Sequence, residues 1–254
     1  TRGIEDIATM YRYNIILSNS DQNETKELEL LDTMLGKQVD GIVMMSDHVT
    51  DKIASAIRQS PVPVVLAGSI INDSSIPSVN IDYFQAAMDA IQLFINKGHK
   101  EIAFVSGPLE YTINGEHKLG AYKQALQQAN IEINEQLIDA TDGTYDEALL
   151  SWESFVQKAH VPTAIFAGSD EIALGVIHAI QDAGKRVPED VEVISFENSK
   201  LARMIRPQLT SVALPLYDIG AVSMRLLTKL LNKEEVPDKN VILPYRIETR
   251  KSTK

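Results

Sequence analysis

The segment AIFAGSDEIALGVIHAIQDAGKRVPEDVEVISFENS, residues Ala164–Ser199, predicts the fold of this chain most clearly. It opens with a short apolar run, continues into an amphipathic stretch over Asp170–Gly184, and closes with a second apolar run at Val191–Ser195. Short runs rich in Val and Ile and bounded by Gly, Pro, Asp or Ser are typical of buried parallel strands. Apolar residues three or four apart indicate a helix, and Gly184 stands where a C-terminal cap belongs. The segment therefore predicts a strand–helix–strand unit.

The same alternation runs through the rest of the chain. Further strands are predicted at Asn14–Ser18, Gly41–Met45, Pro63–Ala67, Ser78–Ile81 and Glu101–Val105. Further helices are predicted at Arg2–Met10, Thr25–Leu35, Tyr83–Lys97 (capped by Gly98), His117–Ala129, Tyr145–Ala159 and Tyr217–Asn232. This alternation implies parallel sheets with helices on both faces, which is an α/β fold. Because there are too many units for one small sheet, we predict two doubly wound lobes, the first ending near Ile81–Tyr83.

The start of the chain departs from this pattern. It opens in the helical stretch Arg2–Met10, with no strand before it. A doubly wound domain normally begins with a central strand. We therefore expect a first core strand, and whatever precedes that strand, to lie before Thr1.

Composition and charge argue against several classes of protein. There is no cysteine, which excludes disulfides and thiolate metal sites. Residues Thr1–Tyr13 do not resemble a signal peptide, and no apolar run is long enough to span a membrane, so we expect a cytoplasmic protein. The formal net charge is −11, from 24 basic and 35 acidic side chains, so this chain is not expected to bind DNA by itself.

The sequence also lacks the motifs that carry catalysis. It contains no phosphate-binding loop, no nucleophile elbow, no zinc-protease motif and no dinucleotide fingerprint. None of the five histidines has a second ligand at convincing metal spacing, and His178 is expected to be packed within its helix. We therefore expect no enzyme, metal or cofactor, and rank an enzyme with an unrecognised site as the last alternative.

One face of the helix predicted at Tyr217–Asn232 carries a stripe of charge. Asp218, Val222, Arg225 and Lys229 stand at positions i, i+4, i+7 and i+11, while the anchoring side carries Ile219, Leu226, Leu227 and Leu230. An acid in the first turn and bases near the end complement the helix dipole. The other interpretation is a docking surface, on which Arg225 and Lys229 grip a phosphate together.

Four motifs, in order, resemble the LacI/GalR transcription regulators. They are KGHKEIAFVSGP (Lys97–Pro108), the stretch Gly168–Ser199, RPQLTSV (Arg206–Val212) and LPYRIETRKST (Leu243–Thr253). Three further segments resemble the branch of that family that controls carbon catabolite genes in low-GC Gram-positive bacteria. These are Arg2–Asn23, Leu35–Val43 and Tyr217–Glu234.

The resemblance implies a type I periplasmic-binding-protein-like fold, in which crossover strands join two subdomains. Residues 1–82 with 214–245 would form the N-terminal subdomain, and residues 83–213 with 246–254 the C-terminal one. It also implies a homodimer, with contacts expected near Leu28–Leu35 and Arg203–Pro207. In this family an N-terminal helix-turn-helix module, absent from this sequence, reads the DNA operator.

The resemblance further implies a protein corepressor, the phosphocarrier HPr phosphorylated on serine. Arg225 and Lys229 would bind the phosphoserine, and Asp218 would face a basic residue of HPr. Further docking contacts are expected from Ile4, Ile7, Tyr11, Tyr217, Val222 and Leu226. The first three of these stand at i, i+3 and i+7, which places them on one helix face, although core packing is the competing interpretation for Ile7.

The effector cleft departs from the family pattern. His117 stands three residues before Gly120, where sugar-responsive relatives have arginine, and Glu197 follows Phe196 where they have aspartate. Asp170 keeps the acidic position of its turn. These departures argue against a conventional tight sugar site and leave a weak anionic ligand such as a sugar phosphate, received by His117 and Lys118. The alternative function is a sugar- or sugar-phosphate-binding protein of the same fold.

Overall fold

The computed structural model describes residues 1–254, which form two compact units. Unit 1 consists of Thr1–Ile81 with Pro215–Pro244, and unit 2 of Asp82–Leu214 with Tyr245–Lys254. Each unit is therefore assembled from separate stretches of the chain. None of the helices is both long and apolar enough to cross a membrane.

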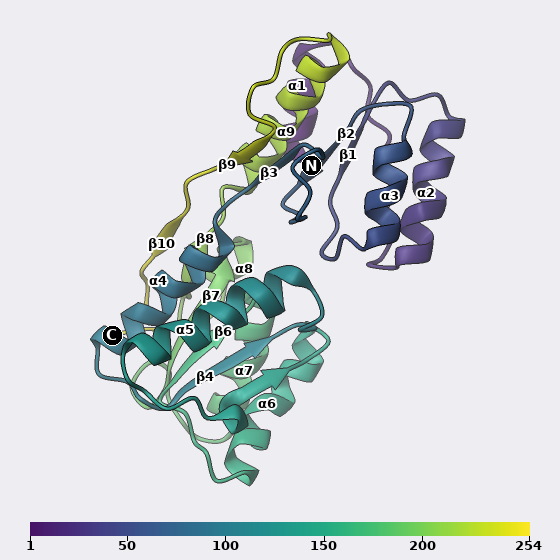
Figure 1. Cartoon of the computed structure of the whole chain (residues 1–254). Coiled ribbons are helices and arrows are strands. Elements are labelled where there is room, and N and C mark those ends of the chain that lie inside the picture. The colour runs from purple at the N-terminus through teal and green to yellow at the C-terminus, as the bar shows by residue number, and fades with distance from the viewer. The chain divides into compact units, whose positions relative to one another are not determined.

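Unit 1 has a four-stranded parallel sheet in the order β1-β2-β3-β9. The strands are β1 (Ile42–Met44), β2 (Val64–Ala67), β3 (Ser78–Asn80) and β9 (Asn240–Ile242). The helices are α1 (Arg2–Met10), α2 (Glu24–Gly36), α3 (Asp51–Gln59) and α9 (Leu216–Leu231), with α1 beside α9 and α2 beside α3 (Figure 1).

Helices cover both faces of this sheet because its central strand is apolar on both sides. Val64 and Leu66 of β2 pack with Ile53 of α3, whereas Val65 packs with Leu227 of α9. Successive side chains of a strand point to opposite faces, so this alternation divides the core of unit 1 in two. The second half of that core, between the sheet and α1 and α9, supports the candidate site described below.

Unit 2 has a six-stranded sheet in the order β10-β8-β7-β6-β4-β5, in which only β10 is antiparallel. The strands are β4 (Ile102–Ser106), β5 (Ile138–Ala140), β6 (Ala164–Ala167), β7 (Glu192–Glu197), β8 (Thr210–Ala213) and β10 (Arg246–Glu248). The helices are α4 (Tyr83–Asn96), the π-helical turn η1 (Ile113–Leu119), α5 (Gly120–Gln128), the 3-10 turn η2 (Glu135–Leu137), α6 (Tyr145–Gln157), α7 (Asp170–Asp182) and α8 (Lys200–Met204).

The strand–helix–strand unit predicted at Ala164–Ser199 is confirmed as β6, α7 and β7, with the two strands adjacent and parallel. The Ser169 hydroxyl caps α7 by accepting a hydrogen bond from the Ile172 backbone N–H at 3.1 Å. Gly98 and Gly184 follow their helices with φ of +86° and +73°, the left-handed conformation expected of C-terminal caps. The predicted α/β fold with two parallel sheets is thus confirmed.

One predicted strand is wrong. Asn14–Ser18 has no regular secondary structure and belongs to neither sheet. A strand exists only where a neighbour accepts its backbone hydrogen bonds, and this segment has no such neighbour in the structure. The prediction also missed α3, α8 and the short strands β5, β8, β9 and β10, none of which carries a long apolar run of its own.

Candidate functional site

The helices α1 and α9 of unit 1 lie unusually close together. A Cβ placed on Gly3 of α1 would be 2.1 Å from the carbonyl oxygen of Tyr217, and one on Gly220 of α9 would be 3.2 Å from the backbone nitrogen of Ile4. Glycine on both helices lets their backbones touch. The pair therefore forms one rigid ridge on the surface of unit 1.

Five of the expected docking residues are exposed on this ridge. They are Tyr11, Tyr217, Asp218, Arg225 and Lys229, and a sixth docking residue, Val222, is half-buried beside them. We call these six residues the α1–α9 face. No carboxylate lies within ion-pair distance of Arg225 or Lys229, so both cations are free to meet a ligand.

Ile7 and Leu226 do not belong to this face, which corrects the expectation that they touch a partner directly. Ile7 is 3% exposed and Leu226 5% exposed, and both pack in the core with Ala8 and Leu227. Leu226 follows Arg225 by one residue, and a step of one residue turns a side chain by about 100° around the helix. Ile4 is half-buried beside Gly220. These three side chains support the face from beneath.

One contact that joins the two helices at this face could not be predicted from the sequence. The Tyr217 hydroxyl donates a hydrogen bond to Asp6 Oδ2 at 2.9 Å. This bond to a carboxylate raises the pKa of Tyr217, and the positive charges of Arg2 and Arg225 partly oppose the shift. Arg2 and Asp6 thus lie near the Tyr217 hydroxyl. Asp6 is 211 positions away from Tyr217 along the chain, so the spacing of residues within one helix could not reveal this contact.

Among the expected cleft residues in unit 2, Phe196 and Glu197 end β7, Asp170 follows β6, and His117 lies on η1. Asp170 has all its contacts within the unit. It is 1% exposed. Its carboxylate accepts hydrogen bonds from the Ser195 hydroxyl at 2.6 Å, the Ser199 backbone N–H at 2.5 Å and the Ser211 hydroxyl at 3.2 Å. The role expected for Asp170 as a ligand contact is therefore corrected: it ties α7 to β7 and β8.

The buried base of this region is Lys118, one residue after His117. Lys118 Nζ donates to the Gly168 carbonyl oxygen at 2.8 Å and to Asn114 Oδ1 at 3.3 Å, and lies 4.7 Å from the centre of the Phe196 ring. Its place on the π-helical turn η1 is notable because such turns frequently mark functional sites. His117 is only half-buried, and burial lowers its pKa.

Glu197, the fourth expected cleft residue, ends β7 in a strained conformation. Its φ is +109°, and that of Asn198 is +57°, both in a region that residues with a side chain seldom adopt. Such strain is found preferentially at binding sites. Phe196 beside it is fully buried and stacks with Tyr83 at a ring distance of 6.2 Å. Phe196 therefore forms the floor of this region.

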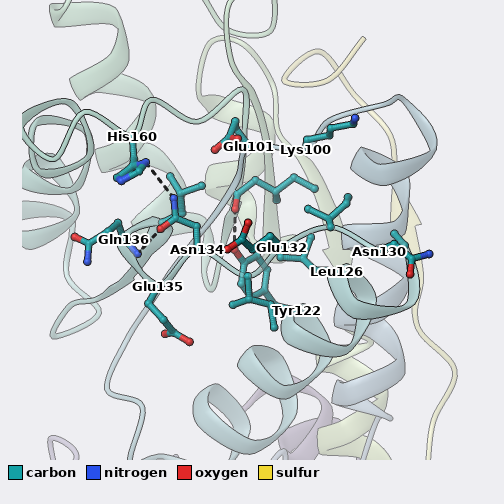
Figure 2. Close-up of a pocket in the computed structure, with 15 residues that line it drawn as sticks. Lys100, Glu101, Tyr122, Leu126, Asn130, Glu132, Asn134, Glu135, Gln136 and His160 are labelled. Carbon is teal, nitrogen blue, oxygen red and sulfur yellow. Dashed lines mark hydrogen bonds between the residues drawn. The ribbon is translucent and has the colours of Figure 1, made fainter.

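A separate cavity of about 740 Å³ lies in unit 2 near the start of β4 (Figure 2). The Tyr122 hydroxyl donates to the Ile102 carbonyl oxygen at 2.8 Å, and the Asn134 amide meets His160 Nδ1 at 3.1 Å. Burial raises the pKa of Tyr122. These polar groups already have partners inside the unit, and the chain contains no group of acidic residues and histidines that could hold a metal ion. The cavity therefore offers no catalytic constellation.

Comparison with known proteins shows what this arrangement resembles. Residues 91–253 match the model of a periplasmic binding protein-like domain. Over 253 residues the chain is 58% identical to the catabolite control protein A of Priestia megaterium, covering 100% of this chain and 76% of that protein. It is 47% identical to the namesake from Staphylococcus xylosus, with the same coverage. The crystal structure of the transcription regulator CcpA of Lactococcus lactis superposes with a TM-score of 0.93 at 43% identity, covering 100% of this chain and 92% of that one.

Proposed function

Because this chain belongs to the catabolite control protein A family of LacI-type transcription regulators, we propose that its α1–α9 face binds HPr phosphorylated on serine. The observation that carries the proposal is the pair Arg225 and Lys229, exposed and free of ion pairs on a chain of net charge −11. They stand four residues apart, which is about 6 Å along a helix. Two cations at that spacing suit one phosphate, whose oxygens accept several charge-assisted hydrogen bonds.

Asp218 adds a negative charge at the other end of the same face. It precedes Arg225 by seven residues, or about 10 Å of helix, and is exposed. A partner with a phosphate near one end of its contact surface and a basic side chain near the other would match this pattern. Complementary charges of both signs fix orientation and suppress wrong partners. Tyr11 and Tyr217 supply exposed aromatic surface beside them, a residue type enriched at interfaces.

We propose that docking acts on a homodimer in the cytoplasm, through a shift in population. A partner that prefers one arrangement of the regulator increases the share of that arrangement. The arrangement favoured by HPr would be the one in which a helix-turn-helix module binds the DNA operator. Dimer contacts are proposed near Leu28–Leu35 and Arg203–Pro207.

Substitution of Arg225 tests the phosphate assignment. Affinity for serine-phosphorylated HPr, measured by titration calorimetry, should fall by about 10- to 150-fold in Arg225→Ala, because a charge-assisted hydrogen bond is worth about 1.5–3 kcal/mol. Lys233→Ala removes an exposed cation just beyond α9 and serves as the matched control. Binding of phosphorylated HPr that is as strong in Arg225→Ala as in Lys233→Ala would refute the assignment.

A second candidate function, binding of a small anionic ligand, rests on unit 2. Lys118 is a buried cation, and the Ser106 hydroxyl beside Gly168 is buried without a hydrogen-bond partner. Together they form a polar spot suited to a phosphate or carboxylate. Calorimetry with glucose 6-phosphate and with neutral sugars distinguishes an anionic ligand from a neutral sugar. Weak binding of glucose 6-phosphate that is lost in Lys118→Met supports the anionic ligand. A micromolar neutral-sugar site would instead favour a sugar-binding protein of this fold.

A further inference from the structure

The cavity of unit 2 drawn in Figure 2 is lined in part by apolar side chains. Ile102, Leu126 and Leu137 are buried there, and Ile131 and Ile133 are half-buried. Its volume of about 740 Å³ lies within the range of about 300–1,000 Å³ that is typical of pockets for small organic ligands. The cavity therefore has the size and the apolar surface of a small-molecule site.

Charged side chains of both signs line the same cavity without a partner inside the chain. The ammonium of Lys100 and the carboxylates of Glu101 and Glu132 are exposed and take part in none of the chain's ion pairs or side-chain hydrogen bonds. Glu135 differs, because Lys123 Nζ binds its carboxylate at 2.8 Å. A ligand that meets the three unpaired charges displaces no protein partner.

These charges are spread along the cavity. Figure 2 shows Lys100 at one end of the view, His160 at the other, and Glu101 and Glu132 between them. No group of three or more acidic residues and histidines in the chain could hold a metal ion, so the carboxylates and His160 do not converge on one point. This arrangement argues against a metal ion and favours an elongated ligand that carries charges of both signs.

We propose that this cavity binds a short apolar peptide of two or three residues with both termini free. The ammonium of the peptide would lie at Glu101 and Glu132, and its carboxylate at Lys100. The side-chain amides of Asn130 and Gln136 line the cavity without hydrogen bonds inside the chain, and an amide can both donate to and accept from a peptide group. Two or three extended residues span about 7–11 Å, which keeps the two terminal charges apart.

Other classes of ligand match these groups less well. A sugar phosphate would be repelled by Glu101 and Glu132, because like charges in one pocket raise the free energy of the complex. A polyamine would meet the carboxylates, but its ammonium groups would also face Lys100 and would offer no acceptor to the amide N–H groups. A single amino acid carries both charges on one carbon atom, whereas the cavity separates the groups that would bind them (Figure 2).

Four tripeptides, titrated into the 254-residue chain and followed by the backbone amide signals in NMR, test the proposal. They are Leu-Ala-Leu with free termini, its N-acetyl form, its C-terminal amide and triglycine. The free Leu-Ala-Leu should shift the amide signals of Ile131 and Ile133. It should bind about three- to five-fold more tightly than each of the other three, because an exposed charge pair strengthens binding only by such a factor.

Two substitutions assign the two ends of the peptide. Glu132→Gln should weaken binding of the free peptide and leave the N-acetyl form unchanged, because that form carries no ammonium. Lys100→Met should weaken binding of the free peptide and leave the C-terminal amide unchanged. Glu110→Gln and Lys185→Met remove exposed charges of unit 2 outside the cavity and are the matched controls.

Equal affinity for the four tripeptides, or no shift of Ile131 and Ile133 at any soluble concentration, overturns the proposal. Spermidine that shifts these signals where the free peptide does not would show a polyamine site and would also overturn it. Equal weakening by Glu132→Gln and Glu110→Gln would show attraction to the overall charge of the chain instead of a site. No residue of the α1–α9 face is involved, so the outcome does not depend on HPr binding.

Discussion

Replacing Gly3 with alanine tests how closely α1 and α9 must pack. The new Cβ would lie 2.1 Å from the Tyr217 carbonyl oxygen and 2.8 Å from the Ala221 backbone nitrogen. Both atoms belong to the backbone of α9, so neither can turn aside as the end of a side chain would. Since non-bonded carbon contacts settle at about 3.5–4.0 Å, the helices would have to separate by roughly 1–2 Å.

The size of the effect follows from two opposing contributions. Alanine in place of glycine inside a helix stabilises the helix by at most about 1 kcal/mol. Overpacking costs about 1–3 kcal/mol, and a clash with fixed backbone belongs at the upper end of that range. We expect Gly3→Ala to lower the free energy of unfolding of unit 1 by about 2 kcal/mol.

Urea unfolding followed by two probes measures this change. The only tryptophan, Trp152, lies in unit 2, so its fluorescence reports unit 2 while circular dichroism reports both units. Gly36→Ala is the matched control, because Gly36 also lies near a helix end and a Cβ there would meet nothing within 4 Å. The reasoning is refuted if Gly3→Ala is as stable as Gly36→Ala by circular dichroism.

Three further predictions concern unit 2. Asp170→Ala should lower the free energy of unfolding of unit 2 by about 3 kcal/mol, since two buried hydroxyls and the half-buried Ser199 N–H lose their acceptor. Urea unfolding followed by Trp152 fluorescence measures this change, and an equal loss in the exposed control Asp142→Ala would contradict it. Burial lowers the pKa of His117 in the folded chain, so as pH falls below about 6.5 the imidazole is protonated in the unfolded chain before it is protonated in the folded one. The free energy of unfolding in urea should therefore fall between about pH 7.5 and 5.5, and it should fall less steeply in His117→Gln. Lys97→Ala leaves Glu192, 2% exposed, without its 2.8 Å ion pair and with only His99 Nε2 at 3.6 Å, and should cost about 3 kcal/mol in the same urea assay. An unchanged free energy of unfolding would contradict this prediction.

The sequence predicted the layers of the fold because burial on both faces forces parallel strands to be apolar throughout. This is why β2, β4, β6 and β7 stood out. Asn14–Ser18 has the same composition, but composition reports the tendency of a segment and not the presence of a neighbour to pair with. The short strand β5 shows the reverse, since Asp139 interrupts it and pairing with β4 alone makes it a strand.

The candidate site was predictable where one helix carries it and unpredictable where two elements meet. The stripe from Asp218 to Lys229 follows from helical spacing alone. The bond between Asp6 and Tyr217 joins distant parts of the chain and needs the fold. Lys118 was expected beside His117 as a receiver of an anionic ligand, but its burial against the Gly168 carbonyl oxygen and the Phe196 ring depends on the π-helical turn η1 and needed the fold.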